Sequence, residues 1–126
     1  MMTHAGDIAP QDRVAGLRTA LRILGAVWAY TDEEIAMIFD ATVDEIQAWR
    51  EAPSTAHISD DQLVRISYIL GIHKALDTLV PERSAHSGFL RRPTPALDGA
   101  SPVDIMREGT SGLRQIRRWL DGACQW

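Results

Sequence analysis

Apolar residues recur at intervals of three and four along most of this chain, which is the period of an amphipathic α-helix. The first series runs from Val14 to Trp28 and predicts a helix that starts at about Asp12. A second, broader series over residues 63–80 predicts a long helix, which Pro81 ends because proline cannot continue a helix. The pattern therefore indicates an all-α fold.

Three of the predicted helices begin with a capping box. In this motif a Ser or Thr oxygen accepts a bond from a backbone N–H, and a Glu or Gln three residues later bonds back. The boxes are Thr31–Glu34, Thr42–Glu45 and Ser59–Gln62. The first two predict short helices over 32–39 and 43–51, and Asp40 in the turn between them tolerates left-handed geometry. We therefore expect a helix-turn-helix-like region over 12–58, preceded by a disordered N-terminus over 1–11.

The rest of the chain is organised around a proline-rich bend. The polar residues 82–88 predict a loop. Pro93 and Pro95 exclude an α-helix around them, because each ring removes an N–H donor and restricts the residue before it. Asp98 and Gly99 then provide turn chemistry, with glycine free to adopt a positive φ.

Two short helices are expected after this bend. Ser101 as N-cap and Pro102 at the first helical position start the first of them, and Gly109 ends it. Thr110 or Ser111 is expected to cap the last helix, whose apolar residues fall on one face.

Composition places the chain among small proteins without a membrane span. It has 126 residues, a formal net charge of −4 and one cysteine, so we expect neither a large enclosed pocket nor a disulfide framework. No apolar run approaches the roughly 18–20 residues that cross a membrane. The N-terminus lacks the basic and apolar segments of a signal peptide. We therefore expect a cytoplasmic protein.

Charge is distributed unevenly along the chain. Residues 31–51 contain seven acids and one arginine, a net of −6, whereas residues 83–118 contain seven arginines and three acids, a net of +4. The negative total opposes nucleic-acid binding over the whole surface. The asymmetry fits two surfaces with different roles, and it also fits two solvated surfaces.

No motif in the sequence predicts catalysis or a bound metal. The histidines lack the spacing of a zinc site with Cys124. His73 and Asp77 lie one helical turn apart and could share a metal, but a histidine at the edge of an apolar stripe is more often simply packed. No nucleophile elbow, dinucleotide-binding glycine pattern or phosphate-binding loop occurs. We therefore predict neither an enzyme, a cofactor nor a metal.

The last helix offers a candidate interaction surface. Arg114, Arg117 and Arg118 fall opposite its apolar face, beside Trp119, and the chain ends on Trp126. Arginine and aromatic residues are common anchors of protein interfaces. Arginines near a helix C-terminus also favour the helix dipole while staying solvated, so both interpretations remain open.

Seven residues through the bend keep a specific spacing. They are Pro93, Pro95, Ala96, Leu97, Gly99, Pro102 and Asp104, and Gly112 and a final amphipathic helix follow them. This arrangement resembles the toxin-binding domain of the Xre/MbcA/ParS antitoxin family. The chain departs from the family pattern at Phe89, where the family usually has Trp, at Thr94, where it has Asn, and at Ile105-Met106, where it has a Leu pair. An Asn that caps or turns the chain locally would be lost at position 94.

The resemblance implies the antitoxin half of a type II toxin–antitoxin pair. The usual partner in this family is a RES-domain toxin that degrades NAD⁺, and the C-terminal region of the antitoxin covers the toxin's active-site cleft. The resemblance assigns residues 59–126 to the toxin-binding domain and Pro95, Leu97, Gly99, Pro102 and Asp104 to the toxin-binding bend. Our surface argument adds Arg114, Arg117, Arg118, Trp119 and Trp126.

Family members also commonly repress their own operon through a helix-turn-helix, often as dimers within larger complexes. We therefore expect a homodimer or a hetero-oligomer with the toxin. In the expected recognition helix Thr42, Gln47 and Arg50 are the candidate DNA contacts, but acidic residues beside them would lie near phosphates. A stand-alone helix-turn-helix transcriptional regulator remains the alternative function.

Overall fold

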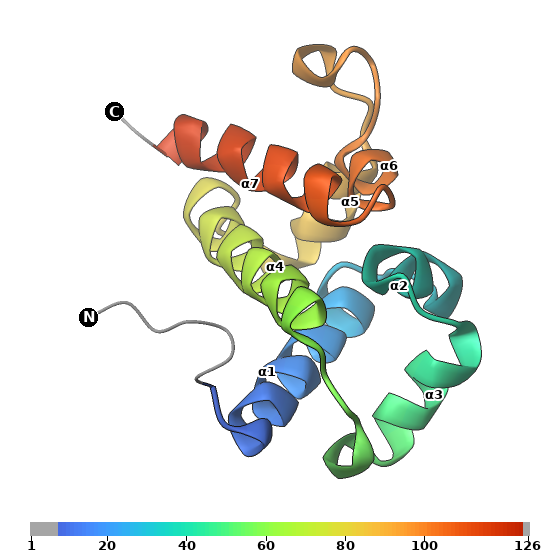
Figure 1. Ribbon diagram of the computed structural model, residues 1–126. Coiled ribbons are helices and arrows are strands. Elements are labelled where there is room, and N and C mark those ends of the chain that lie inside the picture. The colour runs from blue at the N-terminus through green and yellow to red at the C-terminus, as the bar shows by residue number, and fades with distance from the viewer. Residues whose placement is uncertain (1–7, 125–126) are drawn as a thin grey trace.

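The computed structural model describes residues 8–124, and that part of the chain is built from helices with no strand (Figure 1). In chain order the elements are α1 (Pro10–Arg22), η2 (Ile23–Val27), α2 (Asp32–Phe39), α3 (Val43–Glu51), η3 (Pro53–Thr55), α4 (Asp60–Leu79), η4 (Arg83–Ala85), α5 (His86–Arg91), η5 (Pro95–Leu97), α6 (Pro102–Met106) and α7 (Thr110–Cys124). The predicted all-α fold is confirmed.

Helix α4 lies at the centre of the molecule, with α1 and α7 packed against it (Figure 1). Its residues Ile66, Ile69 and Ile72 are at most 1% exposed. One hydrophobic core extends from Leu17 in α1 to Leu120 in α7. The broad apolar stripe of α4 is therefore covered from two sides, and it joins the N-terminal and C-terminal helices into one core.

The first predicted helix starts earlier than expected and changes geometry before it ends. It begins at Pro10 rather than at Asp12, and residues 1–7 of the expected disordered N-terminus lie outside the described residues. From Ile23 the helix widens into a π-helical turn, closed by the bond from the Trp28 N–H to the Ile23 carbonyl at 2.9 Å. The chain can then turn sharply towards α2.

Helices α2 and α3 have the predicted boundaries, and both begin with a complete capping box. Asp40 between them is left-handed, with φ 52° and ψ 48°, as the sequence predicted for this turn. Phe39 and Trp49 hold the two helices together through an edge-on ring contact with centroids 5.8 Å apart. Local capping therefore set these boundaries, while the helix-turn-helix interpretation stays a prediction.

The prediction of a loop over residues 82–88 is wrong. A single 3₁₀ turn at Arg83–Ala85 leads directly into α5, which starts at His86. His86 and Leu90 are both fully buried, and the His86 ring bonds to the carbonyl of Val80 at 2.6 Å. Tertiary burial of these two side chains overrides the polar composition of the segment, which is why the sequence pattern missed the helix.

The expected cap of the last helix is also corrected. Thr110 is already the first residue of α7, and the Leu113 N–H bonds to the carbonyl of Gly109. The Thr110 hydroxyl instead contacts Asp61 of α4 at 3.5 Å. Neither Thr110 nor Ser111 precedes the helix, so neither is its N-cap.

Among the described residues, no helix combines the length and apolar character that crossing a lipid bilayer requires.

Candidate functional site

The proline bend, residues 92–101, stands out from the packed helices as a loop (Figure 1). Backbone bonds close this loop: the Thr94 N–H donates to the Ala100 carbonyl at 3.0 Å, and the Gly99 N–H donates to the Thr94 carbonyl at 3.1 Å. Asp98 and Gly99 both have positive φ, at 57° and 83°. The chain therefore reverses at this pair, as predicted, and two residues rather than one adopt left-handed geometry.

One apolar side chain anchors the bend. Leu97 is 6% exposed, whereas Pro93, Pro95 and Gly99 are exposed. The departure from the family pattern at Thr94 costs the loop little, because the backbone of Thr94 makes the closing bonds while its hydroxyl only donates to the Arg92 carbonyl. The bend is a shaped, exposed surface whose form does not depend on the missing Asn.

Helix α6 fixes the end of the bend through its own cap. The Ser101 oxygen accepts from the Asp104 N–H at 3.3 Å, and the Asp104 carboxylate accepts from the Ser101 N–H at 3.4 Å. Pro102 is buried at the first helical position. Pro102 and Asp104, two of the candidate toxin-binding residues, thus shape the end of the bend, and the exposed Asp104 carboxylate stays accessible from solvent.

Gly112 allows α7 to lie directly against α6. A Cβ at this position would be 1.8 Å from the carbonyl oxygen of Ile105, so no larger residue fits without moving backbone. Leu113, Ile116 and Leu120 then bury one face of α7 at 1% exposure or less. The predicted apolar face of the last helix is confirmed, and its glycine has a packing role.

The three arginines of α7 do not form one free surface. Arg114 donates from Nε to the Tyr68 hydroxyl at 3.2 Å, and Arg117 pairs with Asp121 at 3.0 Å. The Arg117 guanidinium lies over the surface of α4 where Gly71 has no side chain. Arg118 is exposed and makes no ion pair or hydrogen bond within residues 8–124, so its guanidinium is free to contact a partner.

An aromatic pair lies between α5 and α7. The rings of Phe89 and Trp119 stack almost parallel, with centroids 5.9 Å apart and an angle of 11° between the planes. Both side chains are half-buried. Arg92, three residues after Phe89, is exposed and unpaired within the described chain. We call this stacked pair, together with the two exposed arginines that adjoin it in the sequence, the aromatic–arginine face; it consists of Phe89, Arg92, Arg118 and Trp119.

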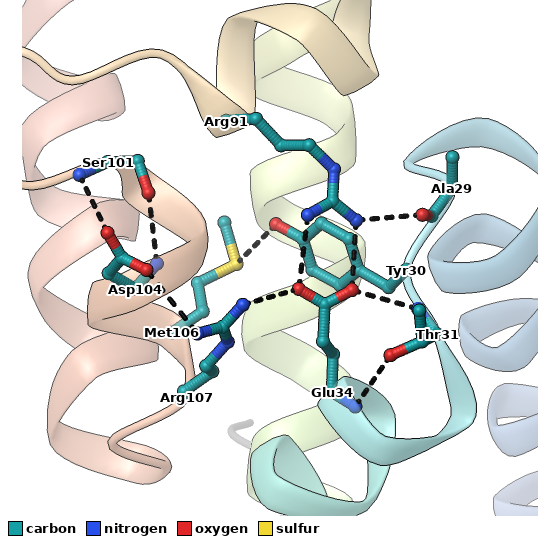
Figure 2. A network of polar contacts seen from close by, with 9 residues as sticks. All are labelled: Ala29, Tyr30, Thr31, Glu34, Arg91, Ser101, Asp104, Met106 and Arg107. Atoms are coloured by element: carbon teal, nitrogen blue, oxygen red, sulfur yellow. Dashed lines mark hydrogen bonds and ion pairs between the residues drawn. The ribbon is translucent and has the colours of Figure 1, made fainter.

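A buried carboxylate connects these C-terminal helices to α2 (Figure 2). Glu34 is 7% exposed, and its oxygens accept two bonds from Arg91, at 2.9 and 3.1 Å, and one from Arg107 at 2.7 Å. The same carboxylate completes the capping box of α2 by accepting from the Thr31 N–H at 2.9 Å. The acidic first half and the basic second half of the chain thus meet at one residue.

Tyr30 completes this network beneath Arg91. The guanidinium lies over the Tyr30 ring at 5.4 Å from its centroid, and the Tyr30 hydroxyl donates to the sulfur of Met106 at 3.6 Å (Figure 2). Burial raises the pKa of the Tyr30 hydroxyl, so this group stays protonated as a donor. The bonds from Arg91 lower the pKa of Glu34 to about 2, so the carboxylate is charged at neutral pH.

The structure assigns different environments to the other predicted site residues. Trp126 lies outside the described residues. Among the candidate DNA contacts, the Thr42 hydroxyl is engaged in the capping box of α3, Arg50 pairs with Asp32 at 2.8 Å, and Gln47 is exposed.

Sequence reasoning missed the roles of three residues. Phe89 was noted only as a departure from the family pattern, Arg91 carried no predicted partner, and Glu34 was predicted to bond only to Thr31 within its capping box. The arginine-rich and acidic segments were visible, but the pairing of residues 57 positions apart depends on tertiary packing. No local spacing in the sequence could reveal it.

Comparison with known proteins identifies the C-terminal part of the chain. The model of the family described as "Antitoxin Xre/MbcA/ParS C-terminal toxin-binding domain" matches residues 75–123, which include the end of α4, the proline bend and nearly all of α5–α7. Over 108 residues the chain is 30% identical to "Uncharacterized protein y4oB" of Sinorhizobium fredii (strain NBRC 101917 / NGR234), and the match covers 85% of this chain and 82% of that protein. No solved structure matches the chain. The chain therefore belongs to the Xre/MbcA/ParS antitoxin family and carries that family's C-terminal toxin-binding domain.

Proposed function

We propose that this antitoxin neutralises a RES-domain toxin that degrades NAD⁺, and that it does so in the cytoplasm by covering the toxin's active-site cleft. The observation that carries the proposal is the exposed proline bend beside the aromatic–arginine face, both inside the region that matches the toxin-binding domain. Such a surface combines the aromatic and arginine residues that dominate protein interfaces.

Inhibition by this surface requires no catalysis by the antitoxin. A rigid loop that fills a cleft excludes substrate by occupying its volume, and a rigid loop loses less conformational entropy on binding than a flexible one. The closed backbone of the bend and the buried Leu97 supply that rigidity. The free guanidinium groups of Arg92 and Arg118 would occupy positions where an NAD⁺ pocket accepts negatively charged phosphates.

The first test is co-expression of this chain with the protein encoded by the adjacent gene, followed by pull-down and an NAD⁺-consumption assay. We expect a stable complex and suppressed NAD⁺ loss. The double variant Arg92→Glu/Arg118→Glu should lose binding and restore NAD⁺ loss, because it reverses both free charges of the face. A matched control, Arg18→Glu/Arg22→Glu on α1, makes the same charge change at exposed positions and should bind normally.

The possible outcomes test three parts of the proposal separately: the class of toxin, the contact surface and the oligomeric state. Complex formation without NAD⁺ consumption by the free partner would exclude the RES-type toxin and leave the antitoxin role standing. Equal loss of binding in both charge-reversal variants would indicate a nonspecific charge effect and would exclude the aromatic–arginine face as the contact. Mass measurement of the purified complex would test the expected homodimer or hetero-oligomer.

We propose operator binding, and with it autorepression, as a second function of the N-terminal helices. One observation favours it: Arg18, Arg22 and Arg50 line a single hollow of about 390 Å³ between α1 and α3, next to Trp49. Three positively charged guanidinium groups around one hollow could bind the negatively charged phosphates of DNA. The exposed Asp44, Glu45 and Glu51 of α3 oppose it.

A gel shift with the chain's own upstream DNA tests operator binding. We expect a shift at low salt that weakens as salt rises, because phosphate contacts release counterions. The variant Arg18→Glu/Arg22→Glu should abolish the shift while keeping toxin binding. The variant Arg92→Glu/Arg118→Glu should keep the shift while losing toxin binding. A shift unaffected by Arg18→Glu/Arg22→Glu would exclude this hollow as the DNA contact.

A further inference from the structure

Three potential metal ligands meet where α4 ends and α5 begins. His73 and Asp77 lie one turn apart on α4, and His86 is the first residue of α5. One ligand atom from each of the three lies within 4.8 Å of the others. The sequence pattern pairs His73 with Asp77, and it favours a packed histidine because His73 lies at the edge of an apolar stripe. The pattern also predicts a loop over 82–88, so it gives His86 no place beside this pair. The helix that brings His86 to this pair changes that conclusion.

The hydrogen bonds of His86 leave one ring nitrogen with a free lone pair. Nε2 lies 2.6 Å from the Val80 carbonyl oxygen, which can only accept, so Nε2 carries the proton. In the neutral ring Nδ1 is then the unprotonated nitrogen. His86 is 0% exposed, and its Nδ1 has no hydrogen-bond partner. A buried polar atom without a partner is costly, so this nitrogen is a candidate to coordinate an ion.

The same pattern is typical of histidines that bind metals. Metal-binding imidazoles almost always donate their other N–H to a carbonyl or a carboxylate, which fixes the tautomer and the orientation of the ring. The Val80 carbonyl has that role for His86. His73 differs, because its buried Nδ1 has no partner and its Nε2 lies 3.7 Å from the Asp77 carboxylate, which is too far for a hydrogen bond.

Two features bear on whether an ion can enter. An ion with metal–nitrogen bonds of about 2.1 Å holds its ligand atoms about 3.4 Å apart, so ligand atoms that lie up to 4.8 Å apart must approach by up to about 1.4 Å. Arg83 binds both oxygens of Asp77, at 3.0 and 2.9 Å, and competes with a cation there. The Arg83 side chain is 57% exposed and can turn into solvent. Arg22 adds a weaker positive field at His73.

We propose that His73, Asp77 and His86 form a binding site for a divalent first-row transition ion of the Zn²⁺ type. Two imidazoles and one carboxylate leave a further coordination position for water or for a partner's side chain. The ion would cross-link the last two turns of α4 to the first turn of α5. It would thereby stabilise the start of the toxin-binding domain, whichever toxin that domain binds.

The test uses the tag-free full chain, freed of metal with EDTA and titrated calorimetrically with Zn²⁺ and, separately, with Mg²⁺. We expect one Zn²⁺ per chain, a higher melting temperature in Zn²⁺, and no comparable response to Mg²⁺, which prefers oxygen ligands. His73→Gln and Asp77→Asn should each weaken Zn²⁺ binding by roughly tenfold or more. The control His57→Gln, at an exposed histidine outside the cluster, should leave it unchanged.

The variant Arg83→Gln should strengthen Zn²⁺ binding, whereas the ligand variants should weaken it. It removes the cation that competes for Asp77, so Zn²⁺ should bind more tightly than to the unmodified chain. A purely structural role of the cluster predicts no such gain. Absence of Zn²⁺ binding, or binding that His73→Gln leaves unchanged, would overturn the proposal. Circular dichroism of each variant would identify any loss of binding that comes only from unfolding.

Discussion

The Glu34 network gives the sharpest prediction about stability. Replacing Glu34 with Gln keeps the side-chain shape and an oxygen that can accept from the Thr31 N–H, but it removes the charge that Arg91 and Arg107 face. The network lowers the pKa of Glu34 from 4.5 to about 2. A shift of this size corresponds to about 3 kcal/mol of folding free energy.

Solvent reduces this value. The side chains of Arg91 and Arg107 are 39% and 36% exposed, so we expect Glu34→Gln to lower the free energy of unfolding at pH 7 by about 2 kcal/mol. Because the pKa in the folded state is the lower one, the stabilisation is present above pH 4.5 and disappears as the pH falls towards 2. The unmodified chain and the variant should therefore converge in stability between about pH 5 and pH 2.

The assay is urea unfolding followed by circular dichroism at several pH values, with Glu33→Gln as the control. Glu33 is an exposed acid in the same turn of α2 and makes no ion pair within the described chain. Its replacement should change stability by less than about 0.5 kcal/mol at any of these pH values. A difference between Glu34→Gln and the unmodified chain that stays constant with pH would refute the reasoning, as would an equal effect of Glu33→Gln.

Three further predictions concern packing and capping. Gly112→Ala should destabilise the chain by about 1–3 kcal/mol, because the added Cβ meets the backbone of Ile105. Gly122→Ala adds a Cβ in open space on the same helix and should stabilise the chain by up to about 1 kcal/mol. Thermal unfolding tests both, since the first variant should melt at a lower temperature than the unmodified chain and the second at a higher one. Ser59→Ala should cost about 1 kcal/mol in urea unfolding, since it removes the cap of α4. Leu97→Ala should cost about 2 kcal/mol or more and should make the bend susceptible to proteolysis, whereas an unchanged cleavage pattern would show that Leu97 does not anchor it.

The parts of the fold that the sequence predicted are those fixed by local chemistry. Capping boxes determine the starts of α2, α3 and α4, and the bonds that they predicted are present at all three. Asp40 adopts the predicted left-handed turn for the same local reason. Each of these features involves residues no more than four positions apart, so the pattern along the chain contains the necessary information.

The features that the sequence did not predict depend on contacts between distant segments. Helix α5 forms because His86 and Leu90 are buried, and nothing in the polar segment 82–88 predicts that burial. Periodicity placed the arginines of α7 on one side of the helix, but it could not tell that Arg114 bonds to Tyr68 or that Arg117 lies over Gly71. The free part of the candidate site is therefore smaller than predicted.

The resemblance located the toxin-binding domain, and the structure refines how its residues are used. Pro102 and Asp104 shape the end of the bend, Leu97 anchors it, and Pro95 and Gly99 are exposed on it. Phe89, which departs from the family pattern, stacks with Trp119. We therefore propose that the exposed residues of the bend and the aromatic–arginine face make the contact, while the buried ones fix its shape.

The most direct test of this account is growth rescue in cells that express the protein encoded next to this chain. Induction of that protein alone should stop growth, and co-expression of the unmodified chain or of Arg18→Glu/Arg22→Glu should restore it. Co-expression of Arg92→Glu/Arg118→Glu, confirmed as folded and equally abundant, should fail to restore growth. Full rescue by that variant would contradict the central claim that the aromatic–arginine face neutralises the toxin.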